Sequence, residues 1–178
     1  MTKLRAASHH TEAMVALIVH ALLGVAVIAW IVRANPQIFA RPAGGPLFTP
    51  LELTYYAAGI AATVIGYYFN HQFVAEFAVP GGNPIWGPGS WQQFIVLGYD
   101  NPAASSASQD YTIISLVLIP LFTIVDGYRR GIRRSWLFWT LVLFTSSAFA
   151  LAFYFAVAER QHRHEKAAKA LDPLPSGA

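Results

Sequence analysis

Four apolar runs, each about as long as a helix that crosses a lipid bilayer, constrain this chain more than any other feature. A bilayer core of about 30 Å requires about 20 mostly apolar residues in helical form. The runs cover residues 12–33, 52–77, 108–128 and 134–158. Backbone N–H and C=O groups find no water in lipid, so each run is expected to be helical. The sequence therefore predicts an all-α fold, an integral membrane four-helix bundle.

The composition favours the same class. Hydrophobic residues make up 55% of the 178 residues and charged residues only 12%, whereas about a quarter of the residues in soluble domains are charged. This length predicts a single transmembrane domain over residues 1–178, in which residues 159–178 form a polar C-terminal tail. Cysteine is absent, which excludes disulfides and cysteine-ligated metals. We expect a multi-pass protein of the cell membrane.

The linker between the second and third runs, residues 78–107, is apolar but rich in glycine and proline. Its recurring glycines and prolines exclude a long helix. We expect this loop to lie on the membrane surface, with residues 90–99 as a short amphipathic or re-entrant segment. Because a large apolar patch usually contacts a lipid or a partner, the loop either covers a polar site or docks a larger complex.

Two local signals shape the third run. Ser106 and Gln109 have the spacing of a capping box, which predicts the start of the helix. Pro120 lies inside the run and removes one backbone hydrogen bond, so we expect a kink there.

Residues 126–136 hold the densest charge in the chain. An aspartate, Asp126, is followed by four arginines. The arginines are Arg129, Arg130, Arg133 and Arg134. We expect Asp126 to pair with the arginine three or four residues later. The four arginines are expected to anchor a cytoplasmic loop, and contact with lipid headgroup phosphates is compatible with that role.

The membrane orientation rests on the distribution of lysine and arginine. No basic residue occurs from residue 42 to residue 128, which places the linker outside. Four crossings would place both termini outside as well, and six of the twelve basic residues would then lie on each side. The density of the arginine loop breaks this tie in favour of a cytoplasmic loop. Basic residues that flank helices form no basic groove, so nucleic acid is not an expected partner.

Short motifs connect the chain to a family. They are "GYYFN" at 66–70, "NPAASSASQD" at 101–110, "VDGYRRGIRRSWLF" at 125–138 and "AERQHR" at 158–163. On these motifs, the segment from about residue 52 to residue 163 resembles the DUF2834 family of small multi-pass membrane proteins. The resemblance implies a membrane architecture with a core of three spans, and it implies no activity because the family is one of unknown function.

Several polar residues are predicted to converge at the outer side of the bundle. They come from the end of the second run and the start of the third, and they are Asn70, His71, Glu76 and Asp110. Two carboxylates without a basic neighbour favour sharing a proton or binding a cation. Trp86 and Trp91 of the linker are further candidates for ligand binding.

Two histidines lie at similar depth in the predicted bundle. His20 is in the first run and His71 is near the end of the second. A facing pair of this kind can ligate a metal, haem iron or a pigment magnesium. No further signature accompanies the pair, so the sequence predicts neither a metal nor a cofactor.

Three functions remain open from the sequence, which does not decide whether the protein is an enzyme. The favoured one is a non-catalytic accessory subunit or lipid-binding membrane module, because no nucleophile–base set, phosphate loop or metal motif is present. The second is a cofactor-free intramembrane enzyme that uses Asp110 and Glu76 as acid and base on an apolar, isoprenoid-like substrate. The third is a small proton or cation carrier. The expected partners are membrane lipids, a larger membrane complex or further copies of this chain.

Overall fold

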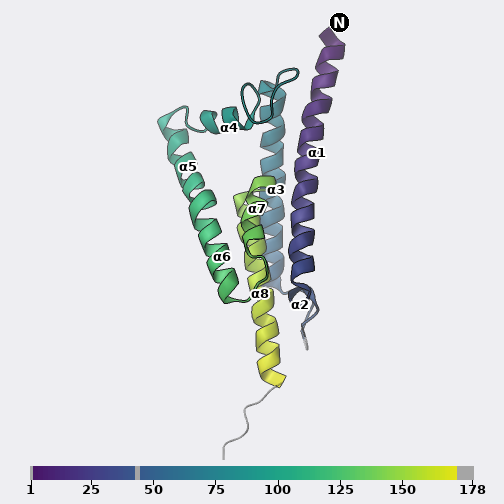
Figure 1. Ribbon diagram of the computed structural model, residues 1–178, viewed down its shortest axis with the longest axis vertical. Coiled ribbons are helices and arrows are strands. Elements are labelled where there is room, and N and C mark those ends of the chain that lie inside the picture. The colour runs from purple at the N-terminus through teal and green to yellow at the C-terminus, as the bar shows by residue number, and fades with distance from the viewer. Residues whose placement is uncertain (1, 43–44, 172–178) are drawn as a thin grey trace, which may run out of the picture.

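The computed structural model describes residues 2–42 and 45–171, and every regular element in these ranges is helical. Helix α1 (Thr2–Ala34) descends in Figure 1, α3 (Pro50–Phe77) ascends, and a third long segment descends again. The short helix α2 (Pro36–Phe39) lies between α1 and α3. The all-α prediction is confirmed.

The third segment begins earlier than the sequence predicted. Helix α5 (Pro102–Ile113) has Asn101 as its N-cap, and the Asn101 side chain accepts hydrogen bonds from the N–H groups of Ala103 and Ala104. The predicted start at Ser106 is therefore wrong. An asparagine followed by proline at the first helical position is a strong start signal, and it precedes the apolar run.

The same segment continues through a π-helical turn. The turn is η1 (Ile114–Leu118), and helix α6 (Ile119–Arg129) follows it. In the turn, the N–H of Ile119 donates to the carbonyl of Ile114, five residues back. Pro120 has no N–H to offer Ser115 in the same pattern, and the indole of Trp139 donates to the Ser115 carbonyl instead, at 3.2 Å. The proline is thus accommodated by a π turn directly before it.

The fourth apolar run forms two helices rather than one. Helix α7 (Trp136–Phe144) and helix α8 (Ser147–Leu171) pack against each other as an antiparallel hairpin. The ring of Phe138 lies 5.1 Å from that of Tyr154 and 5.7 Å from that of Phe153. The prediction of a single helix over 134–158 is wrong.

Hydroxyl side chains at the tip explain the break. Thr145 has φ −129° and ψ −98°, which are not helical, and its hydroxyl donates to the Leu141 carbonyl at 2.7 Å. The Ser146 hydroxyl accepts from the N–H of Phe149 at 3.0 Å, as an N-cap does. Such side chains compete with the helical backbone for hydrogen bonds, so one helix ends and another begins.

The tip of the hairpin lies about midway along the other helices. The Tyr67 hydroxyl donates to the Phe144 carbonyl at 2.9 Å, and the hydroxyls of Ser115 and Ser147 lie 2.6 Å apart. The hairpin enters and leaves at the end of the molecule where α1 ends and α3 begins (Figure 1). The predicted polar tail continues α8 as far as Leu171, and residues 172–178 lie outside the described residues.

The linker contains a short helix within residues 90–99, where the sequence predicted a short amphipathic or re-entrant segment. Helix α4 (Trp91–Leu97) lies across the opposite end of the molecule, between the end of α3 and the start of α5 (Figure 1). Phe94 packs edge-on against Phe73 of α3, with ring centroids 5.2 Å apart. Trp86 and Trp91 are exposed.

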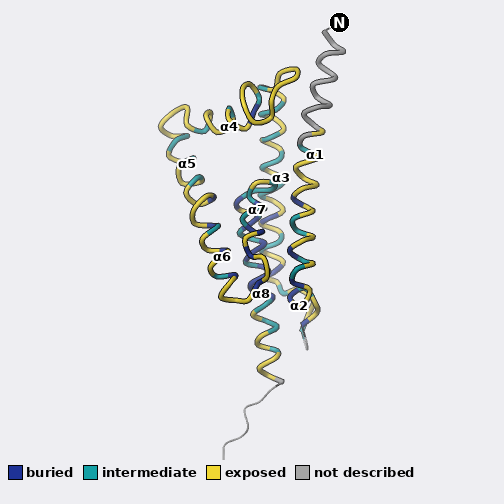
Figure 2. Tube along the Cα trace, viewed as in Figure 1, coloured by how far each residue is buried: buried dark blue, intermediate teal, exposed yellow. Residues whose placement is uncertain are grey.

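The core surrounds the hairpin. Its largest fully buried side chains are Ile31, Leu137, Phe138, Leu141 and Tyr154. The outward faces of α1, α3 and α6 are largely exposed (Figure 2) although they are apolar. By length and composition, two helical segments in the described residues are able to cross a membrane, one within α1 (Leu17–Ala34) and one formed by α5, η1 and α6 (Pro102–Arg129).

We predict that Gly127→Ala destabilises the protein. A Cβ at position 127 would lie 2.4 Å from the Cβ of Ser135, which is fixed to the backbone at the start of α7. Overpacking of this kind typically costs about 1–3 kcal/mol, so the unfolding midpoint in detergent is expected to fall. The control is Gly66→Ala, because a Cβ there meets nothing within 4 Å and alanine is the better helix former. Equal midpoints for the two variants would contradict the close approach of α6 and α7.

Candidate functional site

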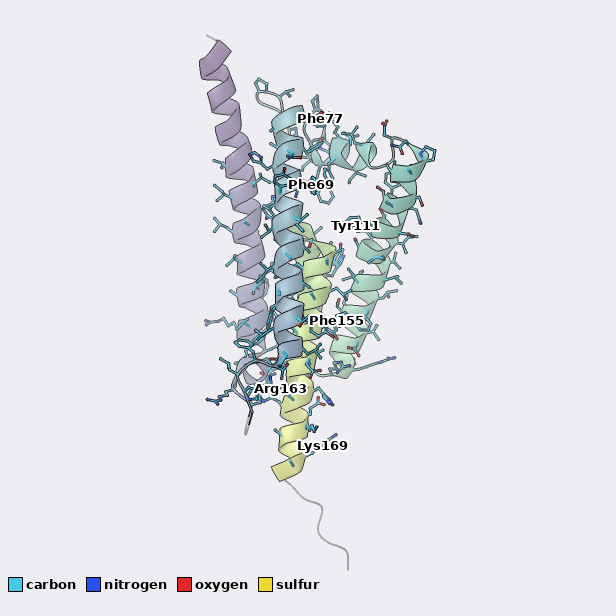
Figure 3. All side chains as sticks on the ribbon, turned by 180° about the vertical axis from the view of Figure 1, so that it is seen from behind. Phe69, Phe77, Tyr111, Phe155, Arg163 and Lys169 are labelled. Carbon is cyan, nitrogen blue, oxygen red and sulfur yellow. The ribbon has the colours of Figure 1, made fainter. Side chains whose placement is uncertain are left out.

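A buried group of three charged side chains joins α8 to the start of α3. The carboxylate of Glu52 is fully buried, 3.5 Å from an Nη atom of Arg160 and 2.7 Å from one of Arg163. Figure 3 shows Arg163 on α8, level with the start of α3. Glu52 also accepts a hydrogen bond from the N–H of Thr49, and the Thr49 hydroxyl accepts from the N–H of Glu52. This reciprocal capping box fixes the start of α3 and the carboxylate together.

The buried guanidinium of Arg160 is saturated by backbone carbonyls as well as by Glu52. It donates to Ile38 at 2.8 Å and to Leu47 at 2.6 Å, with further bonds to the carbonyls of Phe39 and Ala40. One side chain of α8 therefore holds α2 and the loop that leads to α3. Sequence reasoning missed this role and placed Arg160 among the charges that flank the helices. One signal in the sequence could have indicated this role. Glu52 is the only acidic residue between positions 13 and 75, so an acidic group inside an apolar run required a basic partner from elsewhere in the chain.

A second polar cluster lies where α6 ends. Arg130 Nε lies 2.6 Å from Asp126 Oδ2, which confirms the predicted local pair. The Tyr154 hydroxyl donates to the same oxygen at 2.7 Å. The hydrogen bond from Arg130 to Asp126 raises the pKa of the guanidinium above its ordinary value and keeps it charged. Tyr154 was not found from the sequence, because its contact with α6 exists only if the chain turns back at Thr145.

The arginine loop is fixed to the end of α1. Asn35 is fully buried, and its side-chain oxygen accepts from the N–H of Arg133 at 2.8 Å while its amide nitrogen donates to the Arg133 carbonyl at 3.0 Å. The Asn35 side chain thus binds both the backbone N–H and the backbone carbonyl of Arg133. Arg129, Arg133 and Arg134 are exposed around this clamp.

The structure does not gather the polar residues predicted at the other end. Glu76, His71 and Asp110 are exposed, and Asn70 is half-buried. Helix α4 spans the distance between α3, which carries three of them, and α5, which carries Asp110 (Figures 1 and 3). Because α5 begins at Pro102, Asp110 falls in its third turn rather than at its start, and its carboxylate accepts from Gln109 at 2.5 Å.

The histidines likewise do not form a ligand set. His20 packs edge-on against Phe144 with ring centroids 5.8 Å apart, and both His20 and His71 are exposed. Among the side chains that the structure describes, no group of three or more histidine, aspartate or glutamate residues is placed to hold a metal ion. The ion pairs of the described residues lie instead at the end of the molecule that carries the arginine loop.

The comparisons with known proteins give one match. The family model described as "Protein of unknown function DUF2834" matches residues 54–160. The matched segment runs from α3 to Arg160 and leaves out α1 and most of the polar end of α8. The predicted resemblance is confirmed. No curated protein and no solved structure matches the chain.

We predict that Arg160→Met strongly destabilises the protein. The substitution leaves the buried Glu52 carboxylate without its fully buried partner and frees the carbonyls of α2. Breaking a buried ion pair costs about 3–5 kcal/mol, to be measured by denaturant unfolding in detergent. The control is Lys166→Met, an exposed cation on the same helix, for which we expect little change. Adding Glu52→Gln to Arg160→Met is expected to restore part of the loss, and no restoration would argue against the pair.

Proposed function

This chain belongs to the DUF2834 family, and we propose that it is a multi-pass protein of the cell membrane that acts as a non-catalytic, lipid-binding module. The observation that carries this proposal is the reversed polarity of its surface and interior. Leu22, Val64 and Leu121 on three different helices are 62%, 63% and 58% exposed, whereas Glu52 and Arg160 are 0% and 2% exposed. Water disfavours such an apolar exterior, and lipid tails stabilise it.

The lengths of the helices favour three crossings rather than four. The segments in α1 and over Pro102–Arg129 are long and apolar enough to span, and the 28 residues of α3 extend about 42 Å between the same two ends. Helix α7 has 9 residues and reaches only about 14 Å. In this proposal the α7–α8 hairpin enters the membrane and returns to the same side. Its irregular tip is tolerated because Tyr67 and Ser115 satisfy its polar groups within the protein.

Three crossings also remove the equal division of basic residues between the two sides of the membrane. With α8 returned to the side of the arginine loop, ten of the twelve lysines and arginines lie at one end of the molecule, and only Lys3 and Arg5 belong to the other. Four crossings gave six on each side. Since the side with more basic residues faces the cytoplasm, the arginine loop and the C-terminal part of α8 are cytoplasmic. The linker 78–107 and the start of α1 lie outside.

We propose a non-catalytic role because the buried charged groups are already paired and the exposed carboxylates lie apart. The buried charges of Glu52 and Arg160 are bonded to each other and to backbone carbonyls, so they hold the chain rather than face a substrate. The enzyme and carrier hypotheses required Glu76 and Asp110 to converge, but both are exposed, on separate helices. The remaining surface suits lipids, because α4 and its flanks present exposed tryptophans at the outer end, where indoles prefer to lie.

We predict the labelling pattern of single cysteines introduced into this cysteine-free chain. A membrane-impermeant maleimide on intact cells is expected to label Asp100→Cys in the linker. It is expected to label Arg129→Cys in the arginine loop and Lys169→Cys at the end of α8 only after the membrane is opened. All three positions are exposed in the protein.

The label at position 169 separates the two topologies. If Lys169→Cys reacts in intact cells together with Asp100→Cys, the fourth run crosses the membrane and the hairpin proposal is wrong. If all three positions react in intact cells and the protein leaves the membrane fraction at alkaline pH, the membrane proposal itself fails.

A further inference from the structure

Two tryptophans and an arginine meet at the cytoplasmic end of the proposed membrane domain. The rings of Trp30 on α1 and Trp136 on α7 pack edge to face, with centroids 6.0 Å apart. The guanidinium carbon of Arg134 lies over the Trp30 ring, 5.1 Å from its centroid. Both tryptophans are about half exposed, so the cluster faces outward rather than forming part of the core.

The backbone of the loop is held in an unusual shape at this cluster. Arg134 has φ 57°, and it is the only residue other than glycine with a positive φ among the described residues. This left-handed conformation is unfavourable for a residue with a Cβ, and it persists only where the surroundings enforce it. The buried clamp of Asn35 on Arg133 is one such constraint, and the bond from the N–H of Leu137 to the Arg134 carbonyl, at 3.0 Å, is another.

The cations of this cluster have no acidic partner in the part of the chain that the structure describes. The salt bridges there involve Arg130, Arg160 and Arg163 only. Arg33, three residues after Trp30 and therefore on the same face of α1, is exposed, as are Arg133 and Arg134. Three exposed arginines, one of which lies over the Trp30 ring, are thus present at this end without a salt bridge among the described residues.

We propose that this surface, formed by Arg33, Arg133, Arg134, Trp30 and Trp136, binds the phosphate of anionic phospholipids in the cytoplasmic leaflet. The proposal rests on the proposed membrane function and names the lipid class that the domain selects. Guanidinium groups form paired hydrogen bonds with phosphate oxygens, and tryptophans prefer the depth of the headgroups. The anionic lipids of the cytoplasmic leaflet supply the negative charge that these arginines lack.

The experiment uses the full chain in detergent micelles doped with equal amounts of phosphatidylglycerol and phosphatidylcholine. Native mass spectrometry counts the lipids that the protein retains. We expect the unmodified chain to retain phosphatidylglycerol in several-fold excess. Arg133→Gln with Arg134→Gln is expected to weaken retention of phosphatidylglycerol about tenfold or more, because each arginine near an anionic surface contributes substantially to binding.

The control removes the same charge elsewhere. Lys166→Gln with Lys169→Gln lowers the net charge by the same two units on the exposed end of α8, and we expect retention to stay within about twofold of the unmodified chain, since these lysines lie outside the cluster. If the loop variant does not fold, Arg33→Gln tests the same surface from α1, and we expect it to weaken retention as well.

Two results would overturn the proposal. One is an unmodified chain that retains both lipids equally, and the other is a control that loses as much phosphatidylglycerol as the loop variant. A chain that shows the expected cysteine labelling but no lipid preference would overturn this inference alone and leave the three-crossing topology standing.

Discussion

The contact between Arg160 and Glu52 is the constraint on which the rest of the arrangement depends. Glu52 caps the first turn of α3, so its position is fixed to the end of the molecule where α3 begins. Arg160 binds this carboxylate and the carbonyls of α2, so the middle of α8 must lie at the same end. The loop before α7 lies at that end too, through Asn35. The chain leaves this end of the molecule at the loop before α7 and is back at Glu52 by residue 160. It must therefore reverse direction between α7 and Arg160.

The turn places polar groups in the middle of an apolar molecule, and the structure satisfies them locally. The hydroxyl of Ser147 is bonded to Ser115, and the carbonyl of Phe144 accepts from Tyr67. The π-helical turn before Pro120 belongs to the same solution, because it leaves the Ser115 carbonyl free to accept from Trp139 of α7. Pro120 and the hairpin are thus coupled, because the Ser115 carbonyl left free by the π turn accepts the hydrogen bond from Trp139 that orients α7.

The sequence was sufficient for features that depend on near neighbours and insufficient for those that depend on the turn. Apolar run length gave α1, α3 and the segment from α5 to α6, and the spacing of Asp126 and Arg130 gave their pair. Residues 134–158 are mostly apolar, so hydropathy alone does not distinguish one spanning helix from two short ones. The run of hydroxyl side chains from Thr145 to Ser147 was the local sign of a break. Tyr154 and Arg160 have partners 28 to 122 residues away, which no local pattern reveals.

A distance between spin labels at Arg129→Cys and His162→Cys, measured by pulsed electron paramagnetic resonance in lipid nanodiscs, tests the hairpin most directly. In the structure the Gln161 side chain donates to the Arg130 carbonyl, so the two labelled segments are adjacent. We expect a distribution centred below about 25 Å, since adjacent segments differ only by the reach of the labels. A single helix from residue 134 to residue 162 would rise about 40 Å. A distribution centred near that length would contradict the hairpin and the orientation derived from it.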